Sequence, residues 1–255
     1  MLERLDYVKL APKRILDAGA GPAPQAASLL KRYRGATLLA LDFSLPMLQA
    51  RPGRGWLNRL AGRAAPVPVC ADLGRMPLAP RCCSLVWSNM ALHWAADPQR
   101  AIEEFHRVLE VEGLLMFSTI GPDTLKELRS AFPPTEGAPH VHGFVDMHDL
   151  GDMLVAAGFA APVMDTETIT LTYPTVDAML ADLRRSGQAC ALAGRSRGLL
   201  GRARWAAARK ALEGCIRDGR LPATIEVVYG HAWKPVPRRT REGHAIVNLD
   251  TVRKG

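Results

Sequence analysis

Short strand-like runs alternate with longer helical patterns through the first half of the chain, and this alternation constrains the fold most. The apolar helical patterns lie at Pro24–Tyr33, which opens with proline in the first turn, and at Pro98–Leu109, after which Gly113 ends the unit. Such alternation is typical of βαβ units on a parallel sheet, so we expect an α/β fold. The predicted strands are Arg14–Ala18, Thr37–Asp42, Val67–Ala71, Leu85–Asn89 and Leu114–Thr119.

The second half of the chain has a different pattern. A helix over Asp149–Ala157 closes at Gly158, and a strand with alternating threonines covers Pro162–Tyr173. Two helices, about Val176–Arg185 and Arg202–Arg217, form a helical insertion over residues 174–219. A strand over Thr224–Trp233 is expected to return to the sheet edge. We therefore predict one domain over residues 1–234, followed by a basic, disordered tail over residues 235–255.

Composition excludes several classes of protein. The longest stretch without a charged residue, Cys82–Ala96, contains Asn89 and His93, so no segment is predicted to span a membrane. Met1–Lys13 lacks the apolar block of a secretion signal. The five cysteines are odd in number and never show the C-x-x-C spacing of a zinc or redox site. We expect a cytoplasmic protein.

Positive charge is concentrated in one segment. The chain carries a net charge of +8, and the stretch Arg184–Arg220 alone holds ten basic residues against Glu213 and Asp218. A local positive field indicates an acidic partner. A solvated helical face explains the same charges. Nucleic acid is disfavoured because Trp205 is the segment's one aromatic residue and offers few stacking platforms.

The first predicted strand runs into a glycine turn, Asp17-Ala-Gly-Ala-Gly-Pro-Ala-Pro24. A strand, a glycine turn and a helix start together predict free backbone N–H groups for an anionic ligand group. The dinucleotide fingerprint needs a third glycine where Pro24 stands, which weakens that interpretation. An Asp two residues before the first glycine resembles the D-x-G-x-G loop of class I S-adenosylmethionine-dependent methyltransferases. The loop alone also fits an ordinary βα turn.

Two further acids follow later strands. Asp42 ends the second predicted strand, where a carboxylate can accept hydrogen bonds from both ribose hydroxyls. Asp72 follows the third strand, and in the resembling family the matching acid takes the adenine amino group. Each acid alone could cap a helix. Asp17, Asp42 and Asp72 at three successive strand ends together predict a nucleoside-type cofactor.

The fourth predicted strand leads into Ser88–Trp94, at the centre of the crevice. Residues here are expected to face the transferred methyl group. The segment lacks the Asn-Pro-Pro-Tyr-like sequence of DNA adenine methyltransferases, so a base-flipping enzyme is disfavoured. His93 and Trp94 are candidates for substrate contact, with core packing as the alternative.

Four segments carry a narrower resemblance, which covers nearly the whole chain up to Lys234. Ser88–Trp94, Gly121–Arg129, His142 with Asp146–Gly151, and Tyr229–Trp233 resemble the malonyl-[acyl-carrier protein] O-methyltransferases of biotin synthesis. The resemblance implies a Rossmann-like, doubly wound, seven-stranded sheet with a helical insertion before the last strand. It also implies S-adenosylmethionine as cofactor and the free carboxyl of malonyl as methyl acceptor. Arginine-hydroxylating assembly factors of complex I resemble the chain in Leu92–Trp94 and Asp149–Gly151, and remain an alternative.

The resemblance also assigns residues to the site. In-line transfer to an ionised carboxylate requires neither a metal nor a general base, so we predict no metal site and name no catalytic residue. Arg129 is the candidate for the malonyl carboxylate, although a surface arginine is nearly as good an interpretation. His142 is a candidate lid residue, with capping or core packing as its alternative. The predicted cofactor-binding residues are Asp17, Gly19, Ala20, Gly21, Asp42, Phe43, Met47, Asp72, Leu73 and Asn89; the predicted substrate-binding residues are His93, Trp94, Arg129 and His142.

The partner implied is an acyl carrier protein carrying malonyl, docked on the basic segment Arg184–Arg220 because such carriers are acidic. Two departures from the family's pattern qualify this expectation. Ala23 replaces a glycine, which is tolerable if its φ is negative. Sixteen residues precede Asp17, where the family carries an N-terminal helical segment, so we expect either that the chain starts late or that the site is open and catalysis is impaired. A non-catalytic binding protein and a small-molecule methyltransferase are further alternatives.

Overall fold

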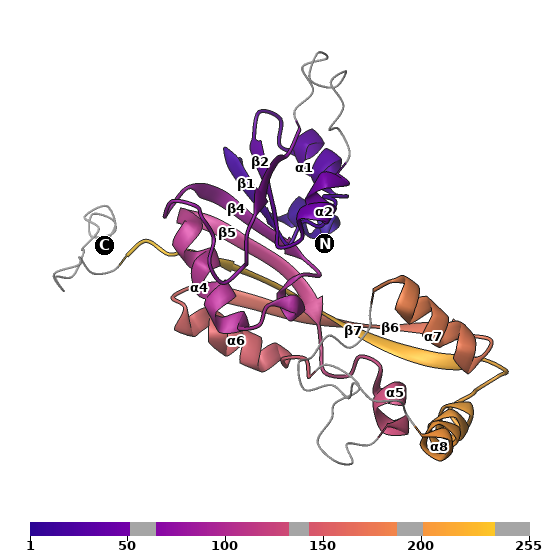
Figure 1. Ribbon diagram of the computed structural model, residues 1–255. Coiled ribbons are helices and arrows are strands. Elements are labelled where there is room, and N and C mark those ends of the chain that lie inside the picture. Colours follow the sequence, from indigo (N-terminus) through magenta and orange to yellow (C-terminus); the bar gives the residue numbers. More distant parts are fainter. Residues whose placement is uncertain (52–64, 133–142, 188–200, 238–255) are drawn as a thin grey trace. The chain divides into compact units, whose positions relative to one another are not determined.

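The computed structural model describes residues 1–51, 65–132, 143–187 and 201–237. Within these residues seven strands form one sheet in the order β3-β2-β1-β4-β5-β7-β6 (Figure 1). β1 pairs in parallel with β2 and β4, and β2 pairs in parallel with β3. The expected Rossmann-like α/β sheet is therefore confirmed. The strands are β1 (Arg14–Ala18), β2 (Thr37–Asp42), β3 (Val67–Cys70), β4 (Cys83–Asn89), β5 (Leu109–Ile120), β6 (Ala160–Tyr173) and β7 (Leu221–Trp233).

Side-chain caps begin several of the helices. Asp97 accepts the backbone N–H of Arg100 at 3.1 Å and Pro98 follows it, so α4 starts with two favourable residues. Thr175 caps α7 in the same way. The helices are α1 (Ala26–Arg32), α2 (Leu45–Gln49), α4 (Pro98–Val108), α5 (Lys126–Ala131), α6 (Met147–Ala156), α7 (Val176–Arg185) and α8 (Arg202–Glu213), with short 3-10 turns η1 (Leu2–Tyr7) and η2 (Leu92–Trp94).

Some predicted boundaries were wrong. α1 opens at Ala26, not at Pro24, because Ala23 has a positive φ of 53° and the chain makes one more turn before the helix begins. Gly113 does not end the α4 unit. It lies inside β5, where an added Cβ would sit 2.8 Å from the carbonyl oxygen of Glu110. α8 ends at Glu213 rather than at Arg217, with Gly214 as its C-cap residue.

The position of the last strand was also predicted wrongly. β7 lies between β5 and β6, so β6 forms the edge of the sheet. The burial of the two strands explains this order. Val227 and Val228 are adjacent in β7, point to opposite faces and are both buried, whereas every residue of β6 from Asp165 to Thr172 is exposed.

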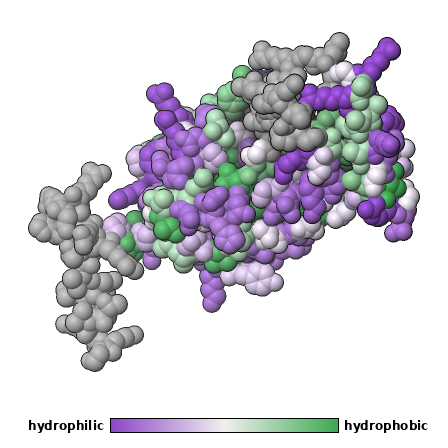
Figure 2. Space-filling model, turned by 90° about the horizontal axis from the view of Figure 1, so that it is seen from below, coloured by the Kyte–Doolittle hydropathy of each residue, from purple (hydrophilic) through white to green (hydrophobic). Residues whose placement is uncertain are grey.

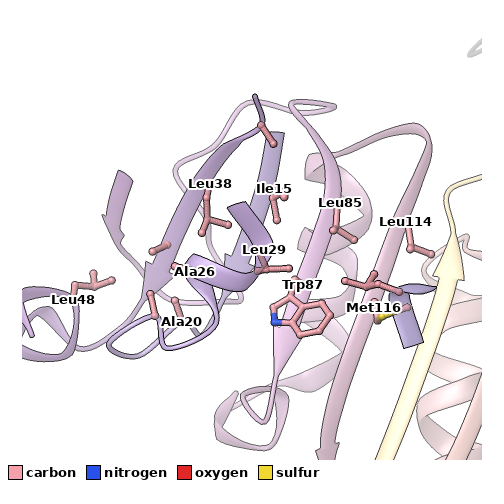
Figure 3. Packing of buried hydrophobic residues seen from close by; sticks show 14 residues of the cluster. Ile15, Ala20, Ala26, Leu29, Leu38, Leu48, Leu85, Trp87, Leu114 and Met116 are labelled. Carbon is pink, nitrogen blue, oxygen red and sulfur yellow. The ribbon is translucent and has the colours of Figure 1, made fainter. Parts of the chain in front are cut away.

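A hydrophobic core holds the strand–helix units together (Figure 3). Ile15 of β1, Leu38 of β2 and Leu85 of β4 project toward Leu29 of α1, and the fully buried indole of Trp87 packs among them. Burial is continuous over Ile15–Ala18 of β1 and over Cys83–Ser88 of β4, so both faces of these central strands are covered. The strands that carry the site acids are therefore held in a fixed register relative to one another.

Two compact units can be distinguished within the chain. The first comprises residues 1–117, 151–163 and 230–255, and the second comprises residues 118–150 and 164–229. In the second unit Val176 and Met179 of α7 pack with Leu212 of α8 in a separate apolar cluster. The helices predicted for residues 174–219 thus have a core of their own. The tail over 238–255 lies outside the described residues.

The surface facing the viewer in Figure 2 is mostly hydrophilic, with apolar side chains scattered among polar ones. In the described part of the chain no helix combines the length and the apolarity needed to cross a bilayer.

Candidate functional site

The glycine turn after β1 folds onto the end of β2. The backbone N–H groups of Gly19 and Ala20 both donate to the carbonyl oxygen of Leu41, at 2.8 and 2.9 Å. Gly21 donates its N–H to Oδ2 of Asp42 at 2.7 Å. Gly19 and Gly21 have positive φ angles of 77° and 55°, which glycine adopts at no steric cost. The turn thereby brings Asp42 beside the end of β1.

These hydrogen bonds correct the expectation of free N–H groups. The N–H groups of Gly19, Ala20, Gly21 and Ala23 all donate within the chain, and Pro22 has none. Because the turn offers no row of such donors, it lacks the usual means of holding a pyrophosphate. The condition set for Ala23 also fails, since its φ is positive.

A close approach explains why the first glycine of the turn has no side chain. A Cβ built on Gly19 would lie 2.1 Å from the Cβ of Ala91, which follows β4. Oγ of Ser88 also donates to the carbonyl oxygen of Ala18 at 2.9 Å, joining the ends of β4 and β1. The segments after β1 and β4 therefore form one wall of the site.

Asp17 is the buried acid of the site. Its side chain is 2% exposed, and Oδ2 has no hydrogen-bond partner among the described residues. The pKa of Asp17 is raised from 3.8 to about 7, mainly by burial and to a smaller extent by the nearby charge of Asp42. A buried carboxyl without a partner is costly, and a cationic ligand would favour its ionised form. The site therefore suits a positively charged group.

Asp42 is held by two backbone donors. Gly21 donates to Oδ2 and Ser44 donates to Oδ1, each at 2.7 Å. An ionised carboxylate oxygen accepts more than one hydrogen bond, so each oxygen keeps capacity for a further donor. The carboxylate is thus oriented before any ligand arrives, as recognition of a vicinal diol such as ribose requires.

Asp72 lies at the same edge of the sheet. β3 pairs with β2 so that Cys70 stands opposite Asp42, and the N–H of Ala71 donates to the carbonyl oxygen of Asp42 at 3.1 Å. Asp72 follows directly and is exposed, with Oδ1 accepting the N–H of Gly74 at 2.7 Å. The three acids therefore lie at the carboxyl ends of neighbouring parallel strands, Asp17 and Asp42 in the last two positions of β1 and β2 and Asp72 just after β3, where open α/β sheets bind ligands.

Apolar side chains lie beside these acids. Phe43 is 80% exposed and Met47 is 50% exposed, although both are large and apolar. Leu45 between them is also exposed, and Leu73 beside Asp72 is half-buried. Exposed apolar groups next to a polar, diol-type site can cover the faces of a flat ring. The structure thus places the predicted residues Phe43, Met47 and Leu73 directly after or close to the acids Asp42 and Asp72 in the chain, with Phe43 and Met47 exposed.

The segment after β4 provides the predicted substrate-facing residues. Asn89 ends the strand half-buried, and Met90 adopts a positive φ of 54°, a conformation that turns the chain sharply. His93 and Trp94 follow in η2 with ring centroids 5.4 Å apart, and Trp94 is 48% exposed. A half-exposed indole at this edge is available to a ligand.

Arg129 belongs to the second unit and is described within it. Its guanidinium donates to the carbonyl oxygens of Pro122 and Thr124, at 2.5 and 3.3 Å, and is half-buried. Arg129 therefore holds the turn between β5 and α5. Two of its five N–H groups are used in these contacts, so others remain for an acceptor. His142 lies outside the described residues.

Several residues that were not predicted also shape the site. Ser44 orients Asp42, and Ala91 limits the space at Gly19. Arg100, Glu104 and Arg107 of α4 bond to the backbone of the loop that carries Asp72. Their spacing of four and three residues along one polar helix face was a signal that could have identified them.

Known proteins match both the sequence and the fold. The family model described as "Methyltransferase domain" matches residues 16–117. A malonyl-[acyl-carrier protein] O-methyltransferase of Gallionella capsiferriformans is 52% identical over 97% of this chain and 86% of its own length. One of Laribacter hongkongensis is 52% identical over 95% of this chain and 82% of its own. The YcgJ protein of Bacillus subtilis shares the fold, with a TM-score of 0.64 and 14% identity over 93% of this chain and 97% of that chain.

Proposed function

This chain belongs to the malonyl-[acyl-carrier protein] O-methyltransferases, and from that premise we propose that it methylates the free carboxyl of malonyl carried on acyl carrier protein, using S-adenosylmethionine. The names of these relatives support malonyl-[acyl-carrier protein] as the substrate. We propose that the methylation is a step in making a biotin precursor. The buried carboxyl of Asp17, whose Oδ2 has no hydrogen-bond partner among the described residues, is the observation that supports the cofactor.

Each part of the site has a role in this proposal. Asp42 accepts hydrogen bonds from the two ribose hydroxyls, and Asp72 accepts a hydrogen bond from the adenine amino group. Asp17 stabilises the positive charge of the cofactor. Gly19 lets the turn pack against Ala91, and Gly21 leaves open space beside the turn for the cofactor. Phe43 and Met47 cover the adenine. Ala20, Leu73 and Asn89 line the same strand ends.

The chemistry asks little of the protein beyond alignment. When bound, the sulfonium supplies an electrophilic methyl group. A malonyl carboxylate is ionised at pH 7, so its oxygen can form the new bond without a general base. The chain's residues therefore need to align the acceptor and exclude water from it. Exposed Trp94 and neighbouring His93 are proposed to pack against the acyl arm, and Arg129 to orient the malonyl carboxylate.

Carrier protein is proposed to dock on the basic segment Arg184–Arg220. Within it Arg209 pairs with Asp177 at 2.6 Å and with Glu213 at 3.1 Å, so this arginine braces α7 against α8. Arg202 and Lys210 of α8 are exposed and are better placed to meet an acidic partner.

Transfer of labelled methyl tests the proposal directly. The protein is incubated with methyl-labelled S-adenosylmethionine and either malonyl-carrier or acetyl-carrier protein, which lacks the free carboxyl. Label on malonyl-carrier alone, released by base as expected of a methyl ester, supports the proposed function. Label on neither carrier, or equal label on both, rejects it.

A further inference from the structure

Side chains on one face of α4 form hydrogen bonds to the backbone of the loop that carries Asp72. This loop, residues 72–78, lies between β3 and β4. Arg100 Nε donates to the carbonyl oxygen of Gly74 at 2.9 Å, and Glu104 Oε2 accepts the N–H of Met76 at 2.7 Å. Arg107 donates to the carbonyl oxygens of Leu78 at 2.7 Å and Met76 at 2.9 Å. Three side chains spaced about one turn apart thus hold successive positions of the loop backbone.

Two of these side chains also fix each other. Arg107 Nε lies 2.5 Å from Glu104 Oε1, and Nη2 lies 2.9 Å from Oε2. This hydrogen-bonded pairing lowers the pKa of Glu104 below its usual range, so the carboxylate is ionised at neutral pH. Charge-assisted bonds of this kind are stronger and more directional than neutral ones. The loop backbone is therefore held by groups that have little freedom of their own.

Gly74 connects these hydrogen bonds to the Asp72 carboxylate. Asp72 Oδ1 accepts the Gly74 N–H at 2.7 Å, while the carbonyl of the same glycine accepts from Arg100. A Cβ on Gly74 would lie 3.2 Å from Asp72 Oδ1 and 3.5 Å from Arg100 Cδ, so the three residues are closely packed. Moving Gly74 would therefore turn the Asp72 carboxylate.

We propose that Arg100, Glu104 and Arg107 are positioning residues that set the nucleobase selectivity of the cofactor site by aiming the Asp72 carboxylate. This inference rests on the proposed function, in which Asp72 accepts a hydrogen bond from the adenine amino group. Hypoxanthine presents a carbonyl oxygen in place of that amino group, and a carboxylate repels it. A well-aimed Asp72 favours adenine over hypoxanthine by about 10- to 100-fold, the range expected for one hydrogen bond to a charged group.

The test compares two neighbouring substitutions of the same kind. Glu104→Gln keeps one acceptor oxygen and puts an NH2 group in place of the other, so Met76 N–H, Arg107 Nε and Arg107 Nη2 can no longer all find an acceptor. Glu103→Gln is the matched control, because Glu103 is exposed and bonds to Gln99 at 3.1 Å, away from the loop. Titration calorimetry measures the affinity of the full chain for S-adenosylhomocysteine and for S-inosylhomocysteine, which carries hypoxanthine.

We expect wild type and Glu103→Gln to share one adenine preference, and Glu104→Gln to reduce that preference at least fivefold. A general loss of structure would weaken the binding of both ligands equally and leave the ratio of the two affinities unchanged. Arg100→Met serves as the second variant, because Arg100 is exposed and its loss threatens folding least. It is expected to lower the ratio as well, and it decides the matter if Glu104→Gln does not fold.

The outcomes separate this inference from the proposed function. If wild type binds and prefers adenine but the variants that fold keep the wild-type ratio, the positioning role is overturned while the proposed function stands. If wild type binds neither ligand, the proposed function itself fails, and the inference fails with it.

Discussion

At the scale of single residues, Asp17 makes stability and ligand binding oppose each other. The carboxyl is buried without a partner on Oδ2, and its pKa is raised to about 7. A raised carboxyl pKa means that the folded state binds a proton more tightly than the unfolded state between pH 4 and 7. The free energy of unfolding contributed by Asp17 is therefore fully present below pH 4, falls as the pH rises and is lost above pH 7.

Asp17→Asn is predicted to remove that pH dependence, which amounts to about 4 kcal/mol at most between pH 4 and 8. Urea unfolding of the variant and wild type at several pH values measures the difference. Asp152→Asn, at an exposed position of α6, is the control and should keep the wild-type profile. Parallel pH profiles for wild type and Asp17→Asn would show that Asp17 does not carry the shifted proton.

Ala23 is the second residue with an identifiable strain. It is fully buried, and its φ of 53° is unfavourable for a residue with a Cβ by roughly 1–2 kcal/mol. Ala23→Gly relieves this strain while it loses a buried methyl worth about 0.8 kcal/mol. We predict a nearly neutral change in unfolding free energy. Ala101→Gly, at a buried helical position in α4, should instead cost about 2 kcal/mol. Equal losses in chemical denaturation would refute the strain at Ala23.

At the scale of elements, the segments after β1 and β4 are matched to each other. Gly19→Ala would place two Cβ atoms 2.1 Å apart, against Ala91. We predict that overpacking lowers the free energy of unfolding by about 1–3 kcal/mol, in addition to the strain of a side chain at a positive φ. Adding Ala91→Gly should recover the overpacking part only. A double-mutant cycle measured by denaturation gives the coupling, and simple additivity of the two changes would contradict this contact.

The bounds of some strands could be predicted from the sequence, but their order in the sheet could not. β1 and β2 were predicted with their observed bounds, because each is an apolar run bounded by charged or turn residues. The place of β7 was not predictable in this way, since the pattern of a strand gives its faces but not its neighbours. The three acids at the strand ends could be predicted because parallel strands bring their carboxyl ends to one edge.

What the sequence could not supply was the use of each polar group. The turn N–H groups were expected to be free, but the carbonyl oxygen of Leu41 and the carboxylate of Asp42 accept three of them. Likewise, the positive φ of Ala23 results from the path between β1 and α1, which no local propensity for alanine indicates. The bonds from α4 to loop 72–78 join residues nearly thirty positions apart and depend on the fold.

At the scale of the whole molecule, the uneven charge predicts how the carrier binds. Arg202→Glu with Lys210→Glu reverses two exposed charges on α8. We predict that KM for malonyl-carrier protein rises roughly tenfold and becomes less sensitive to salt, while the affinity for S-adenosylhomocysteine stays the same. Lys31→Glu, exposed on α1, is the control. An unchanged KM in the double variant would place the docking surface elsewhere.

The carboxylates at the strand ends are proposed to bind an adenosyl cofactor. Titration calorimetry of S-adenosylhomocysteine with wild type and Asp42→Asn tests this proposal most directly, with Asp152→Asn as the control. We predict binding by wild type and by the control, and an affinity at least about tenfold lower for Asp42→Asn, because a ribose hydroxyl loses its charged acceptor. Absence of binding by wild type, or equal affinity in all three proteins, would show that Asp42 does not bind an adenosyl cofactor.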